Sequence, residues 1–165
     1  MNEFSKNRAG NRGFTLVELI AVIVVLAILS GIAVPKYIDY SARAKSAALQ
    51  GALGGIRTGV AQYFADQSVS GTALYPTLTQ LTTVGTVMQE QIPANPYNGL
   101  SSVNSATATE AAAATRTVGT GTSASGWRFY VDNSLSTPAA VFYANSSDAT
   151  RVVDPAGGFI TANKL

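Results

Sequence analysis

The chain has 165 residues, enough for one globular domain with an anchoring segment and too few for two domains of ordinary size. It contains neither cysteine nor histidine, which excludes disulfides and thiolate chemistry and removes the commonest general base and metal ligand. Its formal net charge is +2, but the excess of bases lies in the first thirteen residues, so net charge gives no support to nucleic-acid binding.

The chain begins with a short basic leader, residues 1–13. It contains Lys6, Arg8 and Arg12 against the single acid Glu3, and it ends at Gly13. Basic residues that precede an apolar segment tend to remain in the cytoplasm. We therefore expect the carboxyl-terminal part of the chain to lie on the far side of an inner membrane.

A long apolar segment follows the leader. From residue 14 to 34 only Thr15, Glu18 and Ser30 are polar among 21 residues, and a helix of this length spans roughly 30 Å, the thickness of a bilayer core. A secretory signal fits less well, because its shorter apolar core precedes its cleavage site. Here the candidate cleavage site, after Gly13, comes before the apolar segment.

Glu18 is the one acid in this segment, and a carboxylate among aliphatic side chains is costly unless it is paired. Cleavage between Gly13 and Phe14 would create a partner, because the new α-amino group would lie four residues before Glu18, which is one helical turn. Cleavage at this point leaves the helix attached to the rest of the protein. Its purpose must therefore be the new terminus itself.

The basic leader, the Gly13-Phe14 junction, Thr15-Leu16, Glu18-Leu19 and Pro35 together resemble the class III signal of type IV prepilins and type II secretion pseudopilins. The resemblance implies that a prepilin peptidase cuts after Gly13 and N-methylates Phe14. It also implies that Glu18 pairs with the Phe14 amine of a neighbouring subunit and so sets the register of assembly. A plain single-pass anchor, with Gly13 there by chance, is the alternative.

Gly31 and Pro35 predict a weak point in the helix, because proline lacks the backbone donor and clashes with the preceding turn. In filaments of similar pilins this part is locally melted. The alternative is a simple kink at the membrane exit.

Residues 36–67 keep a helical pattern and predict an amphipathic second half of the stem. Apolar residues recur there at intervals of three, four or seven: Ile38, Ala42, Leu49, Leu53, Ile56, Val60 and Phe64. Four glycines, at positions 51, 54, 55 and 59, lower the helix propensity. We expect contact with the head to compensate, with contact to another subunit as the alternative.

Residues 68–165 predict a small globular head. Tyr75–Leu81 is typical of a loop that enters a short helix, and 92–99 is a rigid passage with two prolines that resembles the Pro-x-x-Pro passage of pseudopilins. Residues 101–125 are nearly all small or polar and predict a surface loop. Aromatic and β-branched residues at 126–132 and 139–144 predict a hairpin, which a last strand around 151–153 or 158–161 would complete.

The expected fold is therefore α+β, a long N-terminal helical stem packed on a small antiparallel sheet. The segments are a leader at 1–13, a transmembrane and assembly helix at 14–35, the amphipathic stem at 36–67 and the head at 68–165. Unlike large type IVa pilins, the chain lacks a carboxyl-terminal cysteine pair. Asn145, Asp148 and Asp154 raise the alternative of a calcium site, but solvated turns are the preferred interpretation, and no metal or cofactor is assigned.

The resemblance implies a non-enzymatic structural subunit of a type IV pilus-like filament. Its expected partners are copies of itself, the prepilin peptidase, an assembly ATPase and an inner-membrane platform protein. The precursor would reside in the bacterial inner membrane, and the assembled form would be an extracellular or periplasmic filament. Two alternatives remain open, a pseudopilin of a type II secretion system and a minor tip pilin that acts as an adhesion or binding module.

Overall fold

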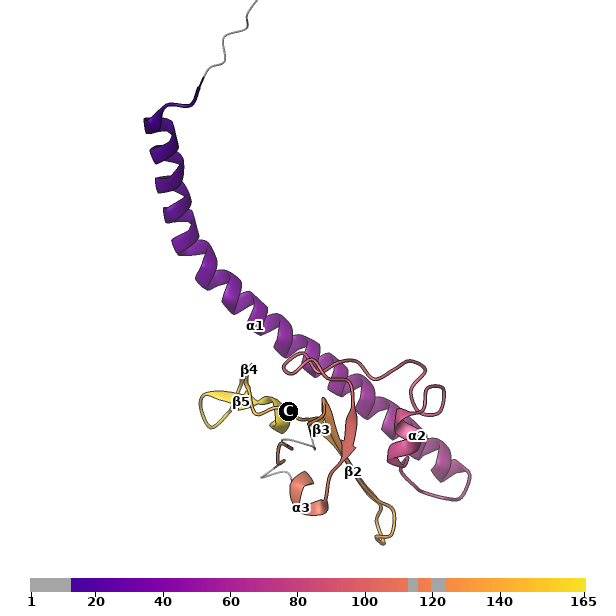
Figure 1. The fold of residues 1–165 in the computed structure, drawn as a ribbon. Coiled ribbons are helices and arrows are strands. Elements are labelled where there is room, and N and C mark those ends of the chain that lie inside the picture. The colour runs from indigo at the N-terminus through magenta and orange to yellow at the C-terminus, as the bar shows by residue number, and fades with distance from the viewer. Residues whose placement is uncertain (1–12, 113–115, 120–123) are drawn as a thin grey trace, which may run out of the picture. The chain divides into compact units, whose positions relative to one another are not determined.

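A computed structural model describes residues 13–112, 116–119 and 124–165 (Figure 1). Its internal contacts divide the chain into two units, Met1–Asp39 and Tyr40–Leu165. Apart from Gly13, the predicted leader lies outside the described residues. The long amino-terminal helix and the small sheets that follow confirm the predicted α+β class.

The first unit consists of the beginning of helix α1, which runs from Leu16 to Val69. The helix continues through Gly31 and Pro35, and nearly all side chains from 13 to 39 are exposed. By length and composition alone, this helix is long and apolar enough to cross a membrane. It ends two residues later than the predicted end at 67. Near this end the Ser68 and Ser70 hydroxyls donate to carbonyls one turn back.

In the second unit the later half of α1 contributes one buried stripe to the core. Its buried residues recur every three or four positions: Ser46, Leu49, Leu53, Ile56 and Val60. Their apolar members pack with Trp127, Phe129 and Phe142 in one cluster. Only one helical glycine approaches the head closely, since a Cβ on Gly59 would lie 2.7 Å from the Met88 sulfur. The expected contact between stem and head is thus present, while Gly51, Gly54 and Gly55 have open space beside them.

The main sheet has three strands in the order β1-β2-β3. β2 (Trp127–Asp132) and β3 (Ala139–Ala144) form the predicted antiparallel hairpin, with Phe129 opposite Phe142. β1 (Val103–Ser105) pairs with β2 in parallel, so this sheet is mixed. β4 (Ala149–Val153) and β5 (Phe159–Thr161) form a separate antiparallel pair instead of completing the first sheet, and a 3-10 helix, η2 (Ala162–Lys164), follows.

The predicted loop at 101–125 contains structure. Besides β1 it holds α3 (Ala108–Ala111), one helical turn whose last residue is buried. A capping box starts α3, because the Thr107 hydroxyl accepts from the Glu110 amide while the Glu110 carboxylate accepts from the Thr107 amide. The short helix α2 (Leu78–Thr82) begins in the same way, with Thr77 and Gln80, and Pro76 lies just before its cap.

Glu110 also holds Arg128, a buried arginine of β2, through a 2.7 Å ion pair. The pKa of Glu110 lies below its ordinary value because the Thr107 amide donates to the carboxylate, with further help from the Thr107 hydroxyl and from Arg128. A lowered pKa means that the unfolded state takes up a proton first as the pH falls. The stabilisation is complete above about pH 4.3, the ordinary pKa of glutamate, and is lost as the pH falls through the folded value.

Glu110→Gln is therefore expected to weaken the acid dependence of stability. The variant should unfold at a lower temperature than the native protein near neutral pH, and the difference should shrink below about pH 4. Thermal unfolding of the full chain in detergent across this pH range measures the effect. Glu90→Gln, at an exposed position, is the control; equal behaviour of the two variants would contradict the assigned role.

Candidate assembly segment

The start of α1 is fixed by a reciprocal pair of hydrogen bonds between Thr15 and Glu18. The Glu18 amide donates to the Thr15 hydroxyl oxygen at 3.2 Å, and the Glu18 carboxylate accepts from the Thr15 amide at 3.2 Å and from its hydroxyl at 3.1 Å. This is a capping box, which satisfies amides that the first helical turn leaves unpaired. A carboxylate in this position also interacts favourably with the positive end of the helix dipole.

Phe14, the predicted new terminus, lies directly before this box, and its side chain is 84% exposed. Along the helix that follows, large apolar side chains are exposed on all sides: Leu16, Val17, Leu19, Ile20, Val22, Ile23, Val24, Val25, Leu26, Ile28, Leu29, Ile32 and Val34. A continuous apolar surface of this extent marks a membrane or protein contact. Glu18 is the one acidic residue between Gly13 and Val34.

Gly31 and Pro35 both lie within α1. A Cβ on Gly31 would meet nothing within 4 Å, so no contact among the described residues requires glycine there. The helix is assigned without a break at this point, and a kink or local melting in a filament stays a prediction.

The three residues considered for calcium accept hydrogen bonds within the head. The Asn145 side-chain oxygen accepts from the Gly119 amide at 2.7 Å, Asp148 accepts from the Ser146 hydroxyl, and Asp154 accepts from the Ala156 amide at 2.8 Å. Within the described ranges no group of three or more acidic side chains is placed to hold a metal ion. These oxygens stabilise turns.

Ser46, which no motif in the sequence marks, joins the stem to two distant parts of the head. Its buried hydroxyl donates to the Ala42 carbonyl at 2.9 Å, lies 3.0 Å from the Tyr97 hydroxyl and accepts from the Arg151 amide at 2.8 Å. Tyr97 belongs to the Pro-x-x-Pro passage and Arg151 to β4. A serine on an otherwise apolar stripe was the only sequence signal for this contact.

Ser46→Ala is expected to lower the free energy of unfolding by about 1 kcal/mol or more, because the Arg151 amide and the Tyr97 hydroxyl each lose a hydrogen-bond partner at a partly buried contact. Chemical unfolding of the full chain in detergent measures the change. Ser41→Ala, at an exposed position on the same helix, should change stability by less than about 0.5 kcal/mol. Equal effects from the two substitutions would show that Ser46 does not hold the stem to the head.

The amino-terminal segment was compared with known protein families. Residues 8–34, which include Gly13, Phe14, Glu18 and Gly31, match the family model of the prokaryotic N-terminal methylation motif. The chain carries the amino-terminal segment of the type IV pilin family. Because the match begins inside the basic leader and ends just before Pro35, it covers the cap, the acid and the apolar helix together.

Relatives that match about a third of the chain are named as fimbrial or major pilin proteins. The chain is 41% identical over 58 residues to the fimbrial protein EcpC of Eikenella corrodens, which is 35% of this chain and 38% of that protein. It is 37% identical over 57 residues to the type IV major pilin PilA of Myxococcus xanthus, 34% of this chain and 26% of that protein. For the type IV major fimbrial protein FimA of Dichelobacter nodosus the identity is 35% over 60 residues, 36% and 38% respectively.

The chain thus spans well under half of the length of these relatives. No solved structure is significantly similar to it. The pilin assignment therefore rests on the methylation motif at residues 8–34 and on matches to about a third of the chain.

Proposed function

We propose that the protein is the structural subunit of a type IV pilus, cut after Gly13, N-methylated at Phe14 and polymerised through its amino-terminal helix. The observation that carries the proposal is the position of Glu18 in the first turn of α1, where it is the one acid of an exposed and almost entirely apolar segment, residues 16–34. The methylation motif that covers this turn and the names of the relatives support it.

The physical basis is the change of partner that cleavage brings. In the uncut chain the Glu18 carboxylate accepts two hydrogen bonds from Thr15, which suits a precursor whose first turn lies near a membrane surface. Cleavage adds an ammonium group on Phe14. Among bundled helices this ammonium offsets the cost of burying a neighbour's Glu18 only when the two groups meet closely.

Register follows from that requirement. A subunit that slips along its neighbour by a few residues leaves a buried charge without a partner, which costs several kcal/mol. The aliphatic surface from 16 to 34 offers no comparable directional contact. It therefore favours association of the helices but does little to fix their register. The pairing of Glu18 with the new Phe14 amine would therefore determine the register between neighbouring helices.

The proposal includes partners and a location. A prepilin peptidase would act on the precursor in the inner membrane, with the basic leader in the cytoplasm. An assembly ATPase, acting through an inner-membrane platform protein, would move the subunit into a helical filament of identical copies. The relatives are named as pilus structural proteins, which fits a protein whose activity is assembly.

Shearing filaments from cells and measuring the amount of this chain in them tests the proposal. We expect it to be the most abundant protein of the sheared filaments, as the names of two relatives suggest. A few copies per filament would indicate a minor tip pilin, and retention in the periplasm together with a defect in protein export would indicate a pseudopilin. Either result would overturn the role of major subunit.

A further inference from the structure

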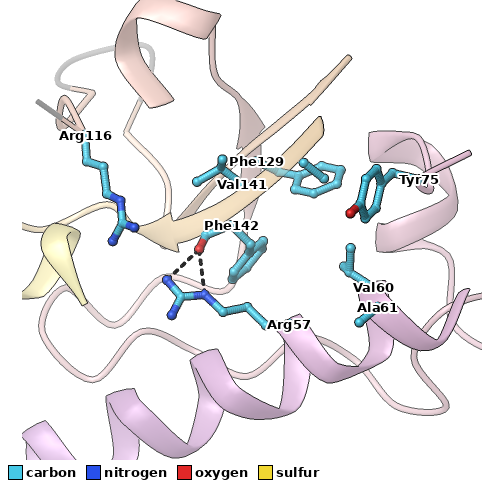
Figure 2. Close-up of a pocket in the computed structure, with 9 residues that line it drawn as sticks. Arg57, Val60, Ala61, Tyr75, Arg116, Phe129, Val141 and Phe142 are labelled. Carbon is cyan, nitrogen blue, oxygen red and sulfur yellow. Dashed lines mark hydrogen bonds between the residues drawn. The ribbon is translucent and has the colours of Figure 1, made fainter. Parts of the chain in front are cut away.

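A cavity of about 320 Å³ lies in the second unit, where the later half of α1 faces β3 (Figure 2). One end of the cavity is lined by cationic side chains and the other by aromatic rings. Figure 2 shows the guanidinium groups of Arg57 and Arg116 at one end, and the rings of Phe129 and Tyr75 at the other. The remaining lining is apolar: Val60, Ala61, Ala140, Val141 and Phe142.

The apolar end is rigid. Phe129 and Phe142 are buried on opposite strands, with ring centroids 6.2 Å apart. Tyr75 is held against Phe64 of α1 in a stacked pair, with centroids 4.3 Å apart. Aromatic walls fixed in this way keep their shape without a ligand and suit a flat or branched apolar group.

Arg57 is held at the cationic end by main-chain oxygens. Its Nε and Nη2 donate to the Phe142 carbonyl at 3.1 and 2.9 Å, and its Nη1 donates to the Leu165 main-chain oxygen at 2.8 Å. These bonds use three of the five N–H donors of the guanidinium and leave two. A terminal carboxylate on Leu165 would balance at most one of the two arginine charges.

Arg116 brings a second cation to the same end. Its backbone adopts φ of 31°, uncommon for a residue other than glycine, and the Asn163 side-chain amide donates to its carbonyl at 2.6 Å. Within the described part of the chain its buried Nε has no hydrogen-bond partner, and its Nη1 makes one long bond of 3.5 Å to the Asn163 carbonyl. The residue is thus fixed in place, while most of its donors have no partner among the residues that the structure describes.

No acidic side chain lies beside the two arginines among the described residues that line the cavity. Residues 113–115 and 120–123 are alanine, threonine, glycine and serine only. Burial and the charge of Arg116 both lower the pKa of Arg57. An anion placed between the two arginines would relieve their repulsion and occupy their free donors.

We propose that this cavity binds a small organic carboxylate, with its carboxylate between Arg57 and Arg116 and its aromatic or branched aliphatic body against Phe129 and Tyr75. A planar carboxylate matches the donor fork of a guanidinium. The apolar end selects an organic anion over inorganic phosphate. The volume, near the lower limit of small-molecule sites, limits the ligand to a compact one.

Titrating the full-length protein in nonionic detergent with 3-phenylpropionate tests this site. The readout is the ¹H–¹⁵N NMR signals of the arginine Nε–H groups, which report on Arg57 and Arg116 directly. We expect both signals to shift and to saturate. Neutral 3-phenylpropionamide lacks the carboxylate and inorganic phosphate lacks the apolar body, so each should bind at least about tenfold more weakly.

Three variants separate the two ends of the cavity. Arg116→Gln removes one cation and Ala61→Phe fills part of the apolar end while leaving both arginines, so each should weaken binding about tenfold or more. Lys45→Gln removes an exposed cation elsewhere on α1 and should leave binding unchanged. The absence of a saturable shift at either arginine, native affinity in Arg116→Gln or in Ala61→Phe, or phosphate binding as tight as that of the carboxylate would overturn the proposal.

Discussion

Replacing Glu18 with valine is expected to leave cleavage after Gly13 intact and to reduce the incorporation of the subunit into filaments by at least about tenfold. We expect cleavage to depend on the leader and on the Gly13-Phe14 junction, neither of which the substitution changes. Incorporation falls because the Phe14 ammonium of each neighbour then has no acid to meet, and an unpaired buried charge costs about 3–5 kcal/mol. The processed protein should accumulate in the membrane.

The ratio of processed subunit in sheared filaments to processed subunit in membranes measures this effect. Ser30→Val is the matched control, because Ser30 is the other polar residue of the apolar segment 16–34 and its replacement changes no charge; this variant should assemble normally. Glu18→Asp keeps the charge on a shorter side chain and should give an intermediate yield. A normal filament yield from Glu18→Val would remove the electrostatic role that we assign to the acid.

The second large effect is expected at Gly126, which precedes β2. A Cβ at this position would lie 1.8 Å from the Leu100 carbonyl oxygen and 2.6 Å from its carbon. The two backbones cannot separate easily, because the Gly126 amide donates to Ser102 at 3.0 Å and its carbonyl accepts from the Asn95 side chain at 2.8 Å. We expect Gly126→Ala to lower the free energy of unfolding by about 3 kcal/mol or more.

Gly54→Ala is the control for this substitution. In α1 a Cβ at Gly54 would meet nothing within 4 Å, so alanine should stabilise the helix by up to about 1 kcal/mol. Denaturant unfolding of both variants, with the full chain in detergent, measures the change in the free energy of unfolding. We expect a decrease for Gly126→Ala and an increase for Gly54→Ala. A Gly126→Ala protein as stable as the native one would show that the close approach of residues 100 and 126 is not needed for the fold.

The sequence predicted the elements whose signals are local. The stripe from Leu49 to Val60 repeats at helical spacing over several turns, and the strands at 127–132 and 139–144 contain five of the aromatic residues of the head. β1 was missed because Val103, Asn104 and Ser105 have no pattern of their own; they form a strand only because β2 lies beside them. The separate β4–β5 pair was also not predicted, because nothing local tells which sheet a strand joins.

The candidate assembly segment was predictable for a different reason. A single acid in a long apolar segment can be recognised from the sequence alone. Gly13 and Phe14 lie five and four residues before Glu18, so the whole signal is local. The contacts of Ser46 and Arg57 connect residues about 50 to 108 positions apart. No periodicity carries such information, so these residues emerged only from the folded structure.

The mass of the amino-terminal peptide of the chain recovered from filaments tests the central claim most directly. The account predicts a peptide that begins at Phe14 and is heavier by one methyl group, with no trace of residues 1–13. A filament protein that begins at Met1, or a cleaved one that begins at any residue other than Phe14, would contradict it, because the ammonium would then not lie one helical turn from Glu18.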